Sequence, residues 1–275
     1  MEYSPTKFKE KMEKHGISLK KMYGQNFIID ENIINNIIKN SGIDEDTLVI
    51  EIGPGAGSLT YKLAQNSKNV LCYEIDKTLK PLLHENLIDY KNIEIIFKDF
   101  LIADIMTDIS KYNYKKLYVV ANLPYYITTP IIIKLIEDLI PVDKIVVMVQ
   151  KEVGDRFRAV PGTKDYNSLS IYLNYYFDVK KILDVSKNVF LPRPNVDSIV
   201  VEFSKKESMI ELKDEKMFFK LVKDAFSQKR KTIKNNLKSY DLSIIEKILE
   251  KNGCSLLTRA EQIPVEVFAE IANNL

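Results

Sequence analysis

The chain has 275 residues, a length that suits one large domain or two modest ones. Hydrophobic residues make up 45% of it and charged residues 28%, a mixture typical of globular proteins and not of disordered or fibrous ones. Forty basic and 38 acidic residues leave a formal net charge of +2, which excludes a polycation that binds anions over its whole surface.

Only two cysteines and two histidines are present, and the cysteines form no CxxC pair. This argues against a Cys/His zinc site, and we expect no metal. The longest apolar stretch, 127–140, is interrupted by Pro130, Lys134, Glu137 and Asp138 and does not resemble a membrane span. The N-terminus is lysine-rich and lacks the apolar core of a signal peptide. We therefore expect a soluble, cytoplasmic protein with no membrane partner.

From about residue 30 to residue 150, short β-branched runs alternate with helical periodicity, which predicts a parallel α/β sheet. Asp30 is placed to cap a helix whose isoleucines recur at helical spacing. Further helices are expected from Ser58, after Asp76 and from about Thr129. The runs expected to form strands are 48–52, 69–74, 93–98, 117–121 and 144–150.

The pattern changes after residue 150. We expect a helix at 151–158, an exposed loop at 160–166 and then another helix. Two strands follow, at 179–185 and 198–203, and a proline-rich turn joins them. Such a pair can complete the sheet with an antiparallel edge.

Only helical periodicity remains from about residue 206 onward. Gly253 is an expected helix end, and Pro264 is an expected helix start. We therefore place a domain boundary near residues 205/206 and predict two domains, 1–205 and 206–275.

The segment from Glu51 to Gly57 reads Glu-Ile-Gly-Pro-Gly-Ala-Gly, between an expected strand and an expected helix. Glycines there allow a sharp turn and a close approach of the backbone to a ligand at a helix N-terminus. A nicotinamide-binding loop has glycine where this chain has Ser58, so the spacing favours S-adenosylmethionine over a dinucleotide. Glu74 closes the next strand, where a carboxylate can accept both ribose hydroxyls of an adenosine. The alternative is a turn that only packs a helix on a strand.

Asp99 ends the third expected strand, so it should lie at the same edge of the sheet. Its carboxylate can accept a hydrogen bond from the exocyclic amine of the cofactor's adenine. Taken alone, an Asp at the end of a strand is more often a helix cap.

The residues Asn122, Leu123, Pro124 and Tyr125 follow the fourth expected strand. The N6 lone pair of adenine is delocalised into the ring, which makes this amine a weak nucleophile. The Asn122 oxygen and a backbone carbonyl beside Pro124 can accept its two N–H bonds and direct the lone pair at a methyl donor. Tyr125 can stack on a base held out of its helix. A sulfonium is an activated donor, so positioning would supply most of the rate. An isolated tetrapeptide of this kind could also be an ordinary turn.

With these motifs in this order, the chain resembles the ribosomal RNA adenine dimethylase family (the KsgA type) over nearly its whole length. The similarity begins at Gly24-Gln25-Asn26-Phe27-Ile28, where the family usually has Gln-Asn-Phe-Leu. The resemblance implies a Rossmann-like class I S-adenosylmethionine-dependent methyltransferase domain, followed by a small all-α C-terminal domain for RNA or ribosome contact. Residues 1–30 would form a basic N-terminal segment and cofactor lid. Further blocks similar to the family lie at 148–153, 190–198 and 226–237.

The resemblance also implies roles for individual residues. Phe190 would form a second aromatic face around the target base, with simple packing under the proline-rich turn as the alternative. Residues 228–238 carry five positive charges and no acid; a solvated lysine-rich surface is the alternative to RNA binding there. The residues expected to contact phosphates are Lys229, Arg230, Lys231 and Lys234. The residues expected to contact S-adenosylmethionine are Asn26, Ile28, Gly53, Glu74, Asp99 and Asn122.

By the same resemblance, the substrate would be a partly assembled small (30S) ribosomal subunit and the enzyme a monomer. Two methyl groups would be added to N6 of each of two adjacent adenosines, in the hairpin near the 3′ end of the 16S RNA. The alternatives are a large-subunit (23S) RNA methylase conferring antibiotic resistance and a non-catalytic ribosome-assembly factor. A DNA adenine methylase fits less well, because those enzymes usually carry Asp/Asn-Pro-Pro-Tyr/Phe.

Overall fold

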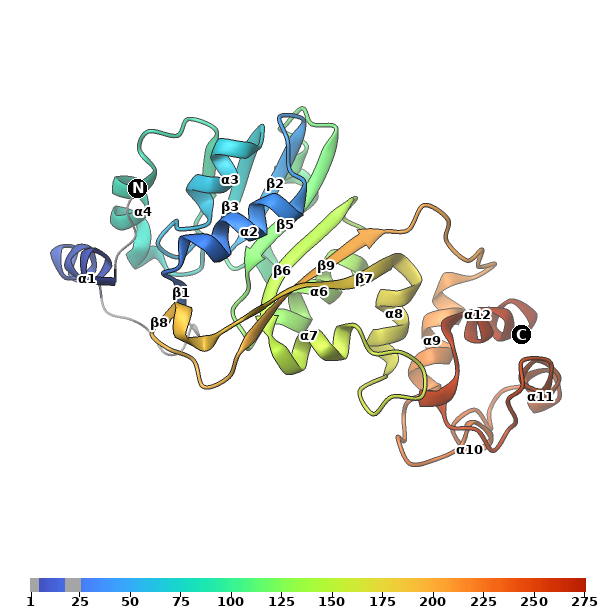
Figure 1. Ribbon diagram of the computed structural model, residues 1–275. Helices are drawn as coiled ribbons and strands as arrows, with labels where there is room; N and C mark the ends of the chain where they lie inside the picture. Colours follow the sequence, from blue (N-terminus) through green and yellow to red (C-terminus); the bar gives the residue numbers. More distant parts are fainter. Residues whose placement is uncertain (1–4, 18–25) are drawn as a thin grey trace. The chain divides into compact units, whose positions relative to one another are not determined.

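The computed structural model describes residues 5–17 and 26–275 (Figure 1). The chain divides into two compact units. The sheet unit comprises the described residues up to Gly154 together with Lys180–Ser204, and the helical unit comprises Asp155–Val179 and Lys205–Leu275. No helix of the described part of the chain is long and apolar enough to cross a membrane.

A seven-stranded sheet forms the centre of the sheet unit. The pairs β2–β3, β2–β5, β3–β4 and β5–β6 are parallel, whereas β9 runs antiparallel to β6. The predicted parallel sheet with an antiparallel edge is therefore confirmed. In spatial order, the strands are β4 (Ile93–Ile96), β3 (Asn69–Tyr73), β2 (Thr47–Ile52), β5 (Lys116–Asn122), β6 (Lys144–Gln150), β9 (Ser198–Lys205) and β7 (Phe177–Val185).

The central strands bury both faces, which explains their continuous β-branched runs. Every residue of β2 is buried. Alternate strand residues such as Val49, Val120 and Val146 share one cluster with Ile34 and Leu63 from flanking helices. Parallel sheets covered on both faces have this pattern because crossover helices must return over the sheet.

Local signals set the helix limits in the sheet unit. Asp30 accepts a hydrogen bond from the Asn32 amide at 2.8 Å, as its predicted capping role requires, and Gly42 ends the same helix in the left-handed conformation. Asp76 caps the turn that leads into α4. The helices are α1 (Pro5–Lys14), α2 (Glu31–Ser41), α3 (Thr60–Asn66), α4 (Lys80–Leu87), α5 (Ile105–Ile109), α6 (Thr128–Glu137) and α7 (Lys151–Phe157). Short 3-10 turns lie at Lys77–Leu79, Phe100–Ile102 and Lys187–Val189.

A second sheet of only two strands was not predicted. β1 (Phe27–Ile28) pairs antiparallel with β8 (Phe190–Leu191), so Ile28 lies opposite Phe190. Two-residue strands are too short to produce an alternating pattern in the sequence.

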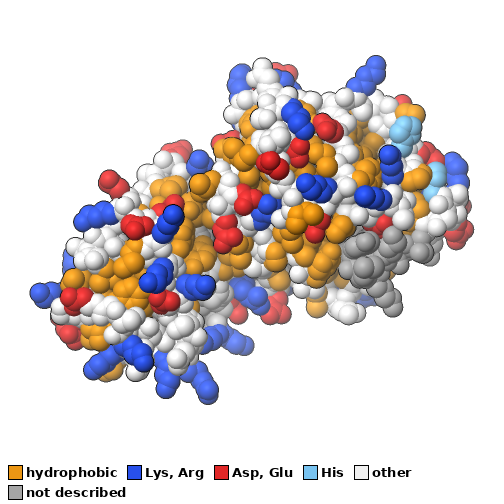
Figure 2. Space-filling model, turned by 180° about the vertical axis from the view of Figure 1, so that it is seen from behind, with side chains coloured by type: hydrophobic (Ala, Val, Ile, Leu, Met, Phe, Trp, Pro, Cys, Tyr) orange, Lys and Arg blue, Asp and Glu red, His pale blue; other side chains and the backbone are white. Residues whose placement is uncertain are grey.

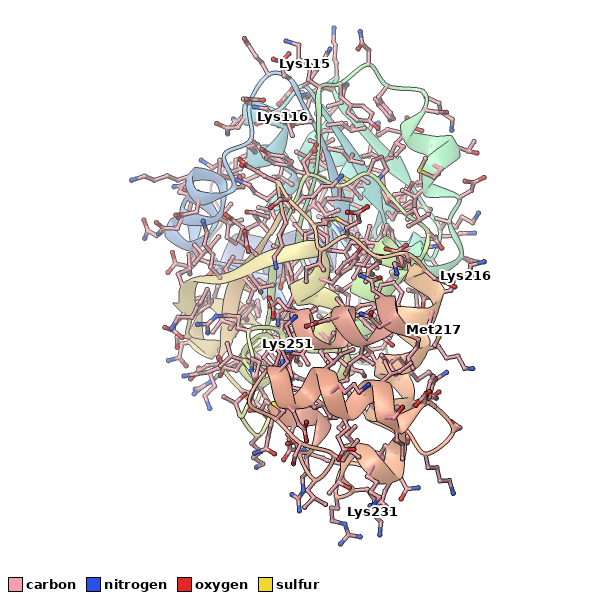
Figure 3. The ribbon with its side chains drawn as sticks, turned by 90° about the vertical axis from the view of Figure 1, so that its right-hand side faces the viewer. Lys115, Lys116, Lys216, Met217, Lys231 and Lys251 are labelled. Carbon is pink, nitrogen blue, oxygen red and sulfur yellow. The ribbon has the colours of Figure 1, made fainter. Side chains whose placement is uncertain are left out.

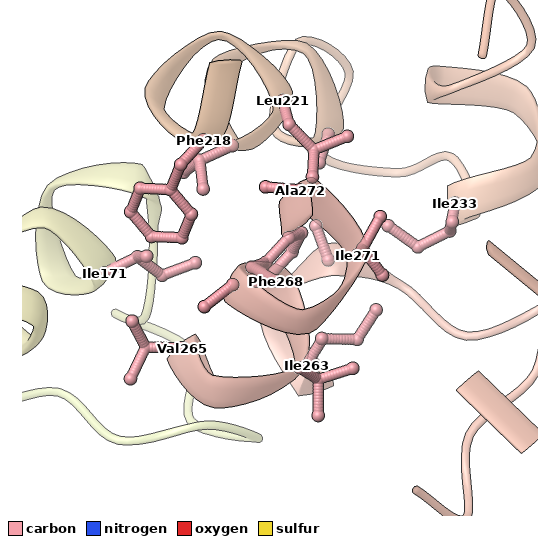
Figure 4. Packing of buried hydrophobic residues seen from close by; sticks show 14 of the residues in the cluster. Ile171, Phe218, Leu221, Ile233, Ile263, Val265, Phe268, Ile271 and Ala272 are labelled. Atoms are coloured by element: carbon pink, nitrogen blue, oxygen red, sulfur yellow. The ribbon is translucent and has the colours of Figure 1, made fainter. Parts of the chain in front are cut away.

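The helical unit packs its helices around one apolar cluster (Figure 4). Phe268 lies at its centre, with Phe218 and Leu221 from one neighbouring helix and Ile171 from another. Gly253 is left-handed (φ 71°) just beyond a helix, and Pro264 directly precedes the last one, as predicted. The elements are α8 (Ser168–Tyr176), α9 (Glu215–Ala225), α10 (Ile233–Asn236), α11 (Leu242–Lys251), a 3-10 turn at Ala260–Gln262 and α12 (Val265–Asn274).

The segment 155–179 belongs to the helical unit, whereas the sequence pattern placed it within 1–205. The reason lies in its large apolar side chains. Tyr166 and Tyr175 are buried in the cluster around Phe268, and the Tyr166 hydroxyl donates to the Ile263 carbonyl at 3.2 Å. The second boundary, at Ser204/Lys205, lies within a residue of the predicted one.

Candidate functional site

A pocket of about 250 Å³ lies at the carboxyl edge of the parallel strands, wholly within the sheet unit. The loops that follow β2, β3, β4 and β5 line it, together with β1. Ligands of open α/β sheets bind in the crevice outside the carboxyl ends of the strands, at the point where the strand order reverses. The pocket brings together nine residues singled out in the sequence: Asn26, Ile28, Gly53, Glu74, Asp99, Asn122, Leu123, Pro124 and Tyr125.

The glycine-rich turn after β2 needs its glycines. Gly53, Gly55 and Gly57 have φ angles of 73°, 60° and 83°, in the left-handed region that disfavours other residues. A Cβ at Gly55 would also lie 2.8 Å from Cε1 of Phe27, closer than side-chain contacts allow. The turn therefore requires glycine both for its backbone conformation and for the close approach of Phe27, and it borders the pocket.

Glu74 lies at the end of β3 and is 4% exposed. Its Oε2 accepts from the Gly55 amide at 3.1 Å, and its Oε1 accepts from the Asp76 amide at 2.8 Å. Burial raises the pKa of Glu74 to about 6, although hydrogen bonds from the Asp76, Gly55 and Ile75 amides act in the opposite direction. A carboxylate has about four lone-pair sites in all, so Glu74 retains acceptor capacity for a ligand.

Glu51 is a second buried carboxyl group in the pocket wall, 1% exposed, and the sequence did not give it a role of its own. Burial raises its pKa to about 8, so the group is largely neutral at pH 7. The Cys72 thiol donates to its Oε2 at 3.6 Å. The acid before the first glycine therefore differs in charge state from Glu74, which stays mostly ionised at the same pH.

Asp99 lines the pocket and also caps the turn Phe100–Ile102, since its Oδ1 accepts from the Leu101 amide at 2.9 Å. The helix-cap interpretation is therefore confirmed, and a contact of Asp99 with the adenine amine stays a prediction. The preceding strand ends at Ile96, two residues earlier than predicted. The cap orients the carboxylate, which retains lone pairs for a ligand.

Asn122 is the last residue of β5, and its side-chain amide is oriented by one contact. Its Nδ2 donates to the Asn26 carbonyl at 2.8 Å. This contact fixes which end of the Asn122 side chain is the nitrogen, and it leaves Oδ1 of Asn122 as an acceptor at the pocket. The Leu123 amide donates to the Met148 carbonyl of β6 at 3.1 Å, which fixes the start of the loop.

The two tyrosines after Pro124 lie in different environments. The Tyr125 hydroxyl is 2.7 Å from Oγ of Ser198, a fully buried residue at the start of β9. Tyr126 is 53% exposed and also lines the pocket. Neither Ser198 nor Tyr126 was singled out from the sequence, although a second aromatic residue directly after the motif was a usable signal for Tyr126.

Phe190 does not lie where the resemblance implied. It is 2% exposed and packs in the cluster that contains Ile28 and Val200, and it is not part of the pocket wall. Pairing of β8 with β1 turns it into the core. The packing alternative therefore describes Phe190 in this structure, and a contact of its ring with the target base stays a prediction.

The four predicted phosphate contacts lie on one exposed stretch of the helical unit: Lys229, Arg230 and Lys231 lie between α9 and α10, and Lys234 lies in α10. Figure 3 shows Lys231 at the far end of this unit with its side chain directed outward, and Figure 2 shows Lys and Arg side chains gathered along the same edge. The Lys229 ammonium donates to the Lys164 carbonyl at 3.3 Å. We call Lys229, Arg230, Lys231 and Lys234 the basic cluster.

Part of the predicted lid, residues 1–4 and 18–25, lies outside the described residues, including Gly24 and Gln25. Helix α1 packs on the sheet unit through Met12, which is 5% exposed. Glu85 of α4 accepts from Lys14 and interacts with His15, each at 2.8 Å, and these contacts hold its pKa down at about 2. A lid function for 1–30 stays a prediction.

Among the residues that the structure describes, no group of three or more His, Cys, Asp or Glu side chains is arranged to hold a metal ion. The pocket wall instead combines carboxylates, one oriented amide and the glycine turn. This donor set suits a ligand with hydroxyl and amine hydrogens.

Two solved structures share this fold. A dimethyladenosine transferase from Plasmodium falciparum superposes with a TM-score of 0.74 at 25% identity, covering 89% of this chain and 95% of that one. The 23S rRNA methyltransferase ErmE has a TM-score of 0.72 at 25% identity, covering 91% and 99%.

The sequence comparisons are more specific. The chain is 46% identical to "Ribosomal RNA small subunit methyltransferase A" of Macrococcus caseolyticus, over 100% of this chain and 97% of the relative. The family model described as ribosomal RNA adenine dimethylase matches residues 16–275. The chain therefore belongs to the ribosomal RNA adenine dimethylase family.

Proposed function

We propose that this enzyme transfers methyl groups from S-adenosylmethionine to N6 of two adjacent adenosines in the 3′-terminal hairpin of 16S RNA. The product would be N6,N6-dimethyladenosine, formed while the small subunit is being assembled. The observation that carries the chemistry is the amide of Asn122, oriented by Asn26 with its oxygen at a pocket that Glu74 and Asp99 also line. The relative's name supports the choice of RNA.

The donor set of the pocket fits S-adenosylmethionine. Glu74 would accept the two ribose hydroxyls with its remaining lone pairs, and Asp99 would accept from the adenine amine. The left-handed turn at Gly53 and Gly55 gives the ligand access to the backbone. When bound, this cofactor supplies a sulfonium-activated methyl group.

Asn122 would position the target amine. Its Oδ1 accepts one N6–H bond, while its nitrogen is already held by Asn26. The Pro124 carbonyl accepts from the Ile127 amide and the Thr128 hydroxyl, each at 3.2 Å, so the Leu123 carbonyl is the better acceptor for the second N–H bond. Two acceptors on one amine draw its lone pair out of conjugation, and alignment then supplies most of the rate.

Tyr125 would stack on the target adenine, since its ring lines the pocket while its hydroxyl contacts Ser198. The buried Phe190 supports this wall from the core and is not assigned a contact with the base. If a second aromatic face is needed, the exposed Tyr126 is better placed.

The basic cluster would contact phosphates of the ribosomal RNA. All four side chains are exposed, and they follow one another within six residues of the helical unit. Such contacts release counterions, so affinity should fall with salt by about 0.7–0.9 in log-log slope for each neutralised phosphate.

A large-subunit RNA methyltransferase is the second candidate, because ErmE shares the fold almost as closely as the dimethyladenosine transferase does. The fold alone does not separate them. The full-length relative at 46% identity is named for the small subunit, which favours the first candidate. A non-catalytic assembly factor is disfavoured by a pocket that retains Glu74, Asp99 and Asn122 together.

The test is methyl transfer from labelled S-adenosylmethionine to three separate substrates: unmethylated small subunits, large-subunit RNA and DNA. Products are identified as nucleosides by mass spectrometry. We expect N6,N6-dimethyladenosine from the small subunit alone. Label only in large-subunit RNA would transfer the assignment to the second candidate, and cofactor binding without any label would favour a binding factor.

A further inference from the structure

The contact between Tyr125 and Ser198 joins residues 73 positions apart in the chain. Their hydroxyl oxygens are 2.7 Å apart, a normal distance for a hydrogen bond between two hydroxyls. Ser198 is fully buried, while Tyr125 reaches the pocket wall. The bond therefore runs from the substrate side of the wall into the core of the sheet unit.

The strand order brings the two residues together. β5, β6 and β9 are neighbours in the sheet, and β9 is antiparallel to β6 (Figure 1). The first residue of β9 therefore lies at the edge where β5 and β6 end, with Ser198 opposite Gln150. Tyr125 follows β5 by three residues and reaches across the end of β6 to this serine.

The backbone next to Ser198 is held from both sides. Pairing with β6 fixes the strand that it begins. The preceding residue, Asp197, accepts from the Lys151 amide through its carbonyl at 3.0 Å and from the Lys187 amide through Oδ1 at 2.9 Å. An anchor on such a strand end has little freedom to move with the loop.

The tyrosine hydroxyl is thus engaged by Ser198, a residue outside the pocket wall, while Tyr125 itself lines the pocket. A tyrosine phenol is protonated at neutral pH, and burial raises the pKa of Tyr125 further. A tyrosine side chain turns about two torsions. A hydrogen bond at its hydroxyl restricts the first torsion, which sets where the ring lies, because the oxygen lies on the axis of the second.

We propose that Ser198 is a positioning residue for methyl transfer, whose hydroxyl fixes the place of the Tyr125 ring and so the position of the adenine stacked on it. This inference rests on the proposed function. Ser198 is not part of the pocket wall, so it would act through Tyr125. Alignment of the attacking nitrogen with the methyl group depends on the position of the ring, so the bond affects the transfer step more than binding.

The experiment compares Ser198→Ala, Tyr125→Phe and the double variant in single-turnover methylation of unmethylated small subunits. Both changes remove the same hydrogen bond, and Tyr125→Phe keeps the aromatic ring. We expect each single variant to lower the rate constant by about three- to tenfold, the range for loss of one hydrogen bond. The double variant should be no slower than the worse single one, because coupled residues are not additive. KM and the cofactor dissociation constant should stay within about twofold.

The matched control is Ser204→Ala, at the other end of the same strand, where the hydroxyl donates to Glu202 at 2.7 Å. It should leave the rate constant unchanged. Melting temperatures of all variants establish folding, and Tyr125→Phe alone still tests the bond if Ser198→Ala is unstable.

Multiplicative losses in the double variant, or an unchanged rate constant in both single variants, would overturn the inference. So would a KM that rises while the rate constant stays. A wild-type chain that does not methylate small subunits at all would instead contradict the proposed function, so the two failures are distinguishable.

Discussion

The described part of the sheet unit contains 21 basic and 23 acidic residues, whereas the helical unit contains 17 basic and 14 acidic ones. The sheet unit, nearly neutral, has the pocket, with oriented groups such as Asn122 and Glu74. The helical unit has an exposed basic cluster on a packed apolar core. We infer a division of roles between the two units. The sheet unit would carry out the chemistry through oriented short-range contacts, and the helical unit would attract a polyanion through long-range charge.

The largest effect is expected at Asn122. Asn122→Ala removes the acceptor for the adenine amine and should slow methyl transfer by about 100- to 1000-fold, as loss of one positioned catalytic hydrogen bond does elsewhere. Cofactor and subunit affinity should change little, because the side chain acts mainly on the amine. Single-turnover rates and calorimetry on the same preparation check this. Activity within a few-fold of wild type would remove Asn122 from its proposed role.

Glu74→Ala tests the cofactor side of the pocket. Loss of the two ribose contacts should raise the cofactor dissociation constant by about 30- to 100-fold, measured by calorimetry. Glu74→Gln is the matched variant: it keeps one acceptor oxygen and should give an intermediate value. An unchanged dissociation constant for Glu74→Ala would refute the ribose contact.

The basic cluster tests the helical unit. Replacing Lys229, Arg230, Lys231 and Lys234 with Ala should raise KM for small subunits by about tenfold and reduce the log-log salt slope by up to about 3. The matched control replaces four exposed lysines elsewhere on the helical unit, and Figure 3 shows one of them, Lys216, far from Lys231. The control lysines are Lys213, Lys216, Lys223 and Lys247. Equal slopes for the two quadruple variants would show that net charge, and not the cluster, attracts the RNA.

The smallest effect concerns stability and pH at Glu51. Its pKa is raised to about 8 in the fold by burial, so the folded chain holds this proton more tightly than the unfolded chain does. The free energy of unfolding of the wild type should therefore fall as pH rises from about 5 to 8. Glu51→Gln should lack this contribution, because its side chain does not titrate. We expect the melting temperature of wild type, relative to Glu51→Gln, to fall by about 5 °C over that range. The same dependence of melting temperature on pH in wild type and Glu51→Gln would contradict a buried, neutral Glu51.

Much of the sheet unit was predictable because its signals are local. The strand 144–150 was predicted to the residue, and Asp30 caps its helix as expected. The pocket followed from topology, since residues that end neighbouring parallel strands meet at one edge. This placed Glu74, Asp99 and Asn122 together without any knowledge of side-chain contacts.

The parts that escaped prediction depend on distant contacts. The bond of Tyr125 to Ser198 and the burial of Phe190 follow from strand order and from a two-residue pairing that leaves no periodic signal. The helix at 168–176 has apolar residues at helical spacing, but such a pattern does not say which core the helix joins. This helix belongs to the helical unit because its tyrosines pack in the apolar cluster of that unit.

The most direct test of this division of roles is the single-turnover rate constant of the variant with all four basic-cluster residues replaced by Ala, measured at saturating small subunits. Saturation removes the contribution of affinity and leaves the transfer step. If chemistry resides in the sheet unit alone, the rate constant should equal that of wild type within about twofold, although far more substrate is needed to reach it. A rate constant that falls as much as KM rises would show that the helical unit takes part in the transfer step itself.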